Sequence, residues 1–174
     1  MIVVALTLAG LASPAATFPE TAAQAIQLAA PSPLAGGWLF ARAPIAGSDR
    51  TSVALIHAVD PLRSDIGIAG LMLRCGEHGF DTILVVVTPY PPSATPQVTI
   101  ATGKGSRTFP ASVLPTGAAL ALPAAASDLA WTAWRNEAEL SISIVDHDST
   151  VNGVIPIAGL DAGLRTLSAI CPAP

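Results

Sequence analysis

The sequence predicts a mainly β, single-domain protein: an antiparallel β-sandwich or small barrel with one short internal helix and a C-terminal helix. Short β-branched or alternating segments recur along the chain, the connections between them are too short for repeated βαβ crossovers, and a helix-like pattern occurs only at 124–134 and 160–170. A length of 174 residues fits one domain.

The strands are predicted from hydrophobic patterning. Segment 82–88 is the strongest, and because its polarity does not alternate we expect both of its faces to be covered. Segment 139–146 alternates cleanly, and in segment 70–75 the residues Leu71, Leu73 and Cys75 share one face. The remaining strands are expected at 38–42, 51–59, 97–102, 107–113, 116–122 and 154–157, with turns at 103–106 and 148–153 and a proline-rich connection at 89–96.

The two helices have different signals. Segment 124–134 follows Pro123, is dense in alanine, and carries Trp131 and Trp134 three residues apart, which predicts one shared helix face. The second helix is predicted from an amphipathic stripe with spacings of four, three and three residues, formed by Leu160, Leu164, Leu167 and Ile170.

The N-terminal segment is typical of an export signal. The apolar run 2–12 has the length of a signal-peptide core, and Ala23-Gln24-Ala25 predicts cleavage after Ala25, with a competing site near Ala16. No Lys or Arg stands between Met1 and Ile2, so either the true start lies upstream or this leader is unusual. We therefore expect a signal peptide at 1–25, a flexible tether at 26–37, and one β-rich domain at 38–174 that lies in the periplasm or outside the cell.

The two cysteines of an exported chain are best explained as one disulfide. Cys75 ends an inward-facing strand pattern, and Cys171 follows a helix whose apolar stripe must also face the core. The bridge would close 96 residues (171 − 75), for which the chain-entropy model gives about 4–5 kcal/mol of stabilisation.

Charge excludes some classes of partner. The net charge is −4, and the 8 Lys and Arg residues are scattered, so no basic stripe for nucleic acid forms. A basic amphipathic helix for an anionic membrane is also lacking. No run of about 20 apolar residues is present to form a stable membrane span after signal cleavage.

Few residues are candidates for chemistry. Asp146-His147-Asp148 could bind a metal or supply a base, but strand neighbours point to opposite faces, so we interpret it as a polar strand end entering a turn. His57, in a β-branched strand, could pair with Asp60, although a structural role is commoner. No catalytic residue, metal or cofactor is predicted, because phosphate-loop and serine-hydrolase motifs are lacking.

The tryptophans allow two interpretations. Trp38, Trp131 and Trp134 could form an aromatic binding surface, for which Trp131 and Trp134 are the best placed. In a chain with 5% aromatic residues they could instead fill the core, which is the interpretation we favour.

Several positions carry a family resemblance. Trp38 opens the domain, Leu71, Arg74 and Cys75 end a strand, and the segment 155–160 precedes a short helix and Cys171. This pattern resembles a loose group of small bacterial envelope proteins, which includes accessory proteins associated with type VI secretion and, more remotely, the invasion-associated locus B group. The resemblance spans 38–171 on about ten positions. It implies an exported, β-rich protein without a recognised catalytic centre. The segment 89–96 and the Trp131/Trp134 helix depart from the pattern.

Three functions follow as hypotheses. We prefer a non-enzymatic periplasmic or secreted protein that binds another envelope protein, because the chain combines an export signal and a disulfide with no clustered catalytic groups. The first alternative is a hydrolase, in which His57 or His147 would meet carboxylates of Asp60, Asp146 or Asp148. The second is a small-molecule carrier with an apolar cavity between sheet and helices.

Overall fold

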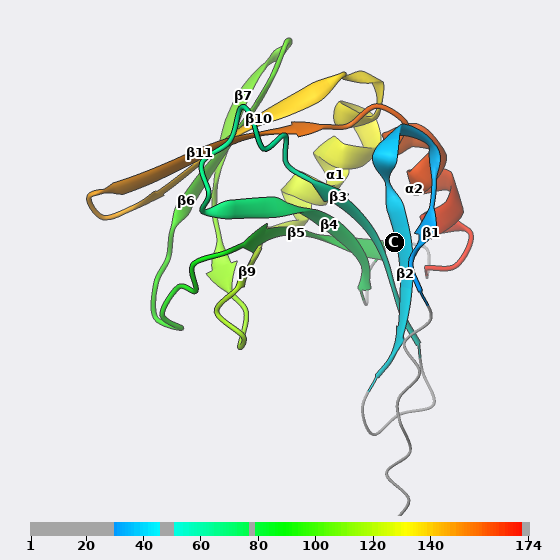
Figure 1. The fold of residues 1–174 in the computed structure, drawn as a ribbon, viewed down its shortest axis with the longest axis horizontal. Coiled ribbons are helices and arrows are strands. Elements are labelled where there is room, and N and C mark those ends of the chain that lie inside the picture. Colours follow the sequence, from blue (N-terminus) through cyan, green and yellow to red (C-terminus); the bar gives the residue numbers. More distant parts are fainter. Residues whose placement is uncertain (1–29, 46–50, 77–78, 172–174) are drawn as a thin grey trace, which may run out of the picture.

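The computed structural model of the chain describes residues 30–45, 51–76 and 79–171. The predicted leader at 1–25 and the first residues of the predicted tether lie outside these ranges. The described residues form two antiparallel sheets and two α-helices around one hydrophobic core (Figure 1). This confirms the prediction of a mainly β fold with one internal and one C-terminal helix.

The larger sheet has seven strands and the smaller has four. Neither described sheet closes on itself, so of the two predicted architectures the small barrel is not formed. The seven-stranded sheet has the order β1-β2-β3-β4-β5-β9-β8, with the bounds β1 Ser32–Pro33, β2 Leu39–Pro44, β3 Thr51–Ala58, β4 Ile68–Gly76, β5 Gly79–Val86, β8 Ser112–Val113 and β9 Ala119–Ala121. The four-stranded sheet has the order β11-β10-β6-β7, with the bounds β6 Gln97–Thr102, β7 Gly105–Pro110, β10 Glu139–Asp146 and β11 Ser149–Pro156.

Both helices pack on the same face of the seven-stranded sheet (Figure 1). Pairing of β3, β4 and β5 aligns Leu55, Leu73 and Thr82 on this face, and all three are buried. Helix α1 (Ala124–Thr132) places the Ser127 hydroxyl 3.0 Å from that of Thr82. Helix α2 (Leu160–Ser168) approaches so closely that a Cβ on Gly163 would lie 3.0 Å from Leu55 Cδ1.

The predicted apolar faces mostly reach the core. The alternating positions of β10 are buried, as are the first three members of the α2 stripe, and the two sets are Leu140, Ile142, Ile144 and Leu160, Leu164, Leu167. The fourth stripe position, Ile170, is exposed because α2 ends at Ser168. In β5, Ile83 and Leu84 are both fully buried, as expected for a strand covered on two faces, whereas Val87 just beyond it is exposed.

Residues 32–37 are structured, which corrects that part of the predicted tether. Ser32–Pro33 pairs with β2, and a short 3₁₀ helix, η1 (Ala35–Gly37), follows. The two prolines of the predicted tether, Pro31 and Pro33, favour a loop, yet proline is tolerated in an edge strand such as β1. Gly36 has a φ of 73°, and a Cβ there would lie 1.7 Å from the Ala158 carbonyl oxygen, so only glycine allows this close approach.

Strand β11 is longer than predicted, so the expected turn at 148–153 is wrong. Asp146 pairs with Ser149, which leaves only His147 and Asp148 to form the turn, with His147 at a φ of 49°. The Asn152-Gly153 pair is typical of a turn, but Gly153 lies within β11, where a Cβ would be 3.2 Å from Ile68 Cδ1. Tight packing, and not turn formation, explains this glycine.

Trp131 and Trp134 do not share a helix face, contrary to the prediction. Helix α1 ends at Thr132, and Trp134 begins a separate 3₁₀ helix, η2 (Trp134–Asn136). Trp131 is 39% exposed and Trp134 only 2%. They therefore form no common exposed aromatic surface, and Trp134 belongs to the core.

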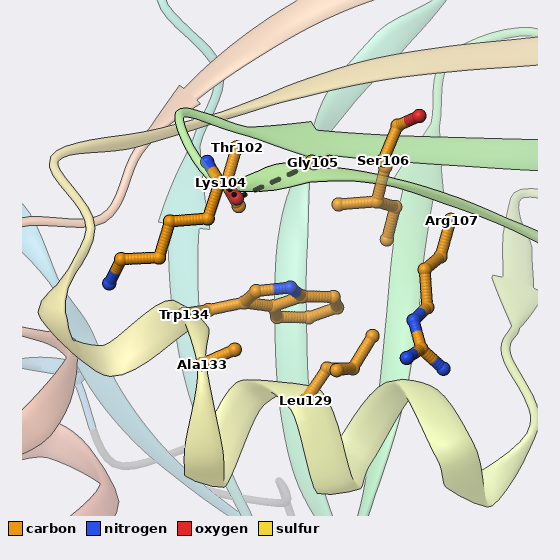
Figure 2. A pocket seen from close by; sticks show the side chains of 9 residues that line it. Thr102, Lys104, Gly105, Ser106, Arg107, Leu129, Ala133 and Trp134 are labelled. Carbon is orange, nitrogen blue, oxygen red and sulfur yellow. Dashed lines mark hydrogen bonds between the residues drawn. The ribbon is translucent and has the colours of Figure 1, made fainter.

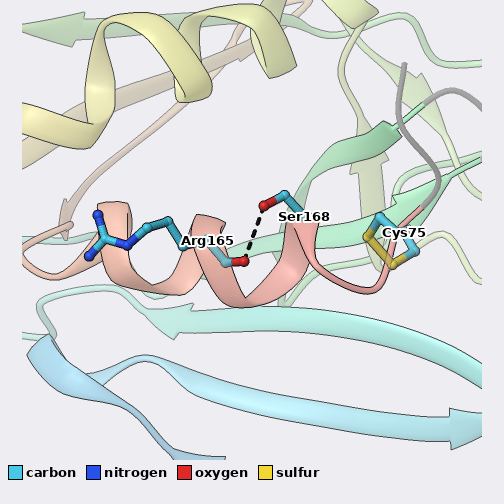
Figure 3. Close-up of a disulfide and its surroundings, with 4 residues drawn as sticks. Cys75, Arg165 and Ser168 are labelled. Carbon is cyan, nitrogen blue, oxygen red and sulfur yellow. Dashed lines mark hydrogen bonds between the residues drawn. A yellow bond between two sulfur atoms is a disulfide. The ribbon is translucent and has the colours of Figure 1, made fainter.

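The predicted disulfide is present. It joins Cys75, at the end of β4, to Cys171, just after α2, with a Cα–Cα distance of 5.2 Å (Figure 3). Cys75 lies on the same strand face as Leu71 and Leu73, as the alternation predicts. The bridge therefore fixes the C-terminal end of α2 to the sheet that this helix covers.

Reduction of this bridge should lower the free energy of unfolding by about 4–5 kcal/mol, because it restores the entropy of a long loop to the unfolded chain. The measurement is urea denaturation with and without a reducing agent, with the Cys75→Ser/Cys171→Ser double variant as control. The reductant should shift the midpoint of the wild type and leave the midpoint of the double variant unchanged. Equal stability of oxidised and reduced wild type would contradict the prediction.

Candidate functional site

His57 lies on the inner face of β3, where it is buried and used for structure. Its Nδ1 is 2.8 Å from the Ala58 carbonyl oxygen, and its Nε2 is 2.8 Å from the Gly36 carbonyl oxygen. The ring also meets the indole of Trp38 edge-on, with 5.0 Å between centroids. A neutral imidazole can donate to one of these carbonyls and a protonated one to both. Since both nitrogens face the backbone, His57 ties η1 to β3 and presents no nitrogen to a substrate.

The Asp146-His147-Asp148 cluster forms the β10–β11 turn. His147 is exposed, and its Nε2 is 3.9 Å from Asp146 Oδ1. Burial, followed by the charge of nearby Asp146, raises the pKa of Tyr90, which lies in the proline-rich connection, above its usual value. The described residues contain no group of three or more His, Cys, Asp or Glu side chains that could hold a metal ion.

The hydrolase candidates are not brought together. The Asp60 carboxylate accepts hydrogen bonds from Arg63 Nε at 2.7 Å and from the Leu62 N–H at 2.9 Å. Asp60 also sits beside Val154, whose carbonyl accepts its N–H. From Val154 to the β10–β11 turn the chain runs along β11 for about 20 Å at the rise of an extended strand. His147 and its flanking carboxylates therefore lie at the far end of the hairpin from Asp60.

The β3–β4 loop (residues 59–67) exposes two large aliphatic side chains. Leu62 is 94% exposed and Ile66 is 91% exposed, more than any other large apolar residue that the structure describes. Val87 is also exposed, and its N–H donates to the Gly67 carbonyl at 3.0 Å, which places it beside the loop. We call Leu62, Ile66 and Val87 the aliphatic patch.

Hydrogen bonds hold this loop along the outer edge of β11. The Asp60 and Asp65 N–H groups each donate at 2.8 Å, to the carbonyls of Val154 and Asn152. In return the Val154 N–H donates to Ser64 Oγ at 2.9 Å, and the Asn152 N–H donates to Asp65 Oδ2 at 2.6 Å. The loop thus covers the edge of β11, which would otherwise offer unpaired backbone groups, and it is anchored at both ends.

The charges around the aliphatic patch are mainly negative. Arg63 bridges two carboxylates, with its Nε 2.7 Å from Asp60 Oδ2 and its terminal nitrogen 2.8 Å from Glu139 Oε2. The hydrogen bond from Arg63, followed by that from the Leu62 N–H, lowers the pKa of Asp60. In turn, the hydrogen bond to the Asp60 carboxylate raises the pKa of Arg63. Asp65 adds a further carboxylate in the same loop, where it accepts a hydrogen bond from the Asn152 N–H. Three carboxylates against one guanidinium give the patch an acidic border.

A pocket of about 210 Å³ lies between the β6–β7 hairpin and α1 (Figure 2). Its apolar lining comes from Ile100, Leu129, Ala133 and Trp134, and its polar lining comes from the hairpin. It is smaller than the roughly 300–1,000 Å³ of pockets that hold drug-sized ligands. The pocket therefore has room for a small group only.

Sequence reasoning missed the aliphatic patch. Segment 60–67 reads as a polar connection with Pro61, and the two aliphatic residues in it have no periodic partner. That isolation is the only available signal: Leu and Ile inside a turn-forming segment have no strand or helix face to bury them.

Comparisons of the chain with protein-family models, with curated proteins and with solved structures found no match. The resemblance to the type VI secretion-associated and invasion-associated locus B proteins therefore stays a prediction. Within the described ranges, no helix has both the length and the apolar character needed to cross a membrane.

The Asp60–Arg63 contact should give a measurable titration. The Asp60 pKa should lie below its ordinary value of 3.8 in the folded protein, because the guanidinium and a backbone N–H stabilise the carboxylate. Because the Asp60 pKa is lower in the folded than in the unfolded protein, the Asp60–Arg63 contact contributes fully to the free energy of unfolding at pH values above the unfolded pKa. This contribution is lost as the pH falls through the folded value, below about 4.

Carboxyl-carbon NMR can follow the titration in the wild type and in Arg63→Gln. The variant should move the Asp60 pKa back toward its ordinary value, while the Asp81 carboxylate, which pairs with Arg74 elsewhere, serves as an internal control. An Asp60 pKa that does not respond to Arg63→Gln would contradict the assigned cause.

Proposed function

We propose that this chain is an exported, non-enzymatic binding protein of the bacterial periplasm or cell exterior, and that its aliphatic patch docks onto another envelope protein. The observation that carries the proposal is a hydrogen-bonded loop that presents Leu62 and Ile66 almost fully to solvent. The use of His57 in backbone contacts favours binding over catalysis.

The energetics of the patch suit a protein contact. Burying a Leu or Ile side chain contributes roughly 1.5–3 kcal/mol, so the two residues can anchor an interface. Because the loop is already held by β11, little further ordering is needed when the partner binds. A stable interface buries about 800 Å² on each partner, so these residues would form its centre and not its whole extent.

The acidic border narrows the class of partner. Asp60 and Asp65 lie in the loop that carries the exposed aliphatics, and Glu139 pairs with Arg63 of that loop, so their net negative charge would repel the headgroups of an anionic membrane. They suit a protein with an apolar cleft flanked by Lys or Arg. Such a contact should weaken as salt screens the charges.

The proposed compartment rests on two supports. The Cys75–Cys171 disulfide is consistent with an oxidising extracytoplasmic compartment. The apolar leader predicted at 1–25 would deliver the chain there.

The Leu62→Asp/Ile66→Asp double variant should lose partner capture by at least about tenfold while keeping the wild-type unfolding midpoint, since exposed residues contribute little to folding. The measurement is affinity capture from envelope extract, with the retained protein identified by mass spectrometry and its recovery compared at low and high salt. Val145→Asp, an exposed aliphatic position on β10, is the matched control and should retain capture. A partner recovered equally by the double variant would remove the patch from the interface.

A further inference from the structure

A second site lies at the opposite edge of the four-stranded sheet from the aliphatic patch. The strand order places β11, which the β3–β4 loop covers, at one edge and β7 at the other. The pocket of Figure 2 lies beneath the β7 edge, against α1. Its residues play no part in the proposed docking of an envelope protein.

Arg107 occupies an unusual position in this pocket. It pairs with Ile100 across the β6–β7 ladder, two residues along from the Val98–Phe109 pair. Residues two apart in a strand share a face, so Arg107 lies on the same inner face of the sheet as these buried residues. Ile100, Val98 and Phe109 are buried, as inner-face residues should be. The Arg107 guanidinium is unusual among these apolar side chains, because it has no anionic partner among the described residues.

The other cation of the pocket is already neutralised. The Lys104 ammonium forms an ion pair with Glu137, with 2.7 Å between Nζ and Oε1. The angles of this contact do not meet those of a hydrogen bond, but the two charges still compensate each other. The pocket therefore has one uncompensated positive charge, on Arg107. One guanidinium matches the single charge and the two oxygens of a carboxylate, with which it forms paired hydrogen bonds.

Trp134 supplies a flat apolar wall and a further donor. Figure 2 shows its indole extended across the pocket, with the nitrogen on the edge that faces the β6–β7 hairpin and with Leu129 nearby. No hydrogen bond of that N–H to another described residue is found, so it is a candidate donor to a ligand. A ligand with a planar or branched apolar body would contact the indole and Leu129 together.

The geometry points to a binding site for a small monocarboxylate with an aromatic or branched aliphatic body. The carboxylate pairs with Arg107, and the body lies against Trp134 and Leu129. A neutral ligand would leave the guanidinium unpaired, and a doubly charged anion would exceed the one free positive charge. The volume of about 210 Å³ suits one such group. It can come from a free small acid or from the carboxyl-terminal residue of a polypeptide.

The test is a titration of ¹⁵N-labelled protein followed by NMR, since the chain has 3 tryptophans and hence as many indole N–H signals. Phenylacetate represents the free acid, and a short peptide ending in phenylalanine represents a polypeptide terminus. Phenylacetamide and the amidated peptide are the neutral controls. We expect at least one of the two acids to shift the Trp134 signal, and the matching amide to bind at least about tenfold more weakly.

Three variants decide whether Arg107 makes the contact. Arg107→Gln should weaken binding of the acid about tenfold or more while keeping the unfolding midpoint, because the side chain is exposed. Arg42→Gln, at an exposed arginine over Phe40 on β2, should bind like the wild type. The Leu62→Asp/Ile66→Asp variant should also bind normally, so failure of the docking proposal and failure of this one are distinguishable.

The outcomes separate the sources as well. Binding by phenylacetate alone identifies a small acid, and binding by the free-ended peptide alone identifies a polypeptide terminus; either supports the site. The proposal is overturned if neither acid moves the Trp134 signal, if the amides bind as well as the acids, or if Arg107→Gln changes nothing.

Discussion

The structure depends on how α2 covers the inner face of the seven-stranded sheet. The helix can approach β3 closely only because Gly163 leaves room for Leu55, and the disulfide then holds the end of the helix to β4. At its other end, Gly159 lies against the backbone of η1, where a Cβ would be 2.5 Å from the Ala35 carbonyl oxygen. The same η1 turn accepts the hydrogen bond of His57. Sheet, helix and N-terminal turn therefore form one unit, and the residue most suggestive of chemistry is part of its packing.

This packing also decides where the exposed surfaces lie. Because the helices cover the inner face of the larger sheet, the smaller sheet completes the core with its own apolar face and has two edges that need protection. The β3–β4 loop protects the β11 edge through backbone bonds, and its aliphatic side chains then have no core to enter. At the β7 edge no loop among the described residues forms such bonds, and the gap between the hairpin and α1 becomes the pocket lined by Trp134 and Arg107.

The sequence was informative where local periodicity and packing agree. Strict alternation predicted the buried face of β10. The presence of only two cysteines in a chain with an export-type leader predicted the disulfide, and the inward strand face of Cys75 supported it. Prediction was wrong where a long-range contact overrides a local signal: Pro33 is tolerated at a sheet edge, and Gly153 is required by packing against Ile68. Neither surface was predictable, because the exposure of Leu62 depends on hydrogen bonds to β11 and the setting of Arg107 depends on its register with Ile100.

Exposure alone does not make the patch a binding surface, because single apolar side chains are common on protein surfaces. The anchoring of the loop is the stronger argument. A loop needed only to connect β3 to β4 could satisfy its polar groups with water, yet Asp60, Ser64 and Asp65 all bond to one strand and hold the backbone that carries Leu62 and Ile66. Anchoring the loop does not make the exposure of these two aliphatic side chains to water any more favourable. The arrangement becomes favourable when a partner removes both side chains from water, since the ordering that binding would require has already been met by the fold.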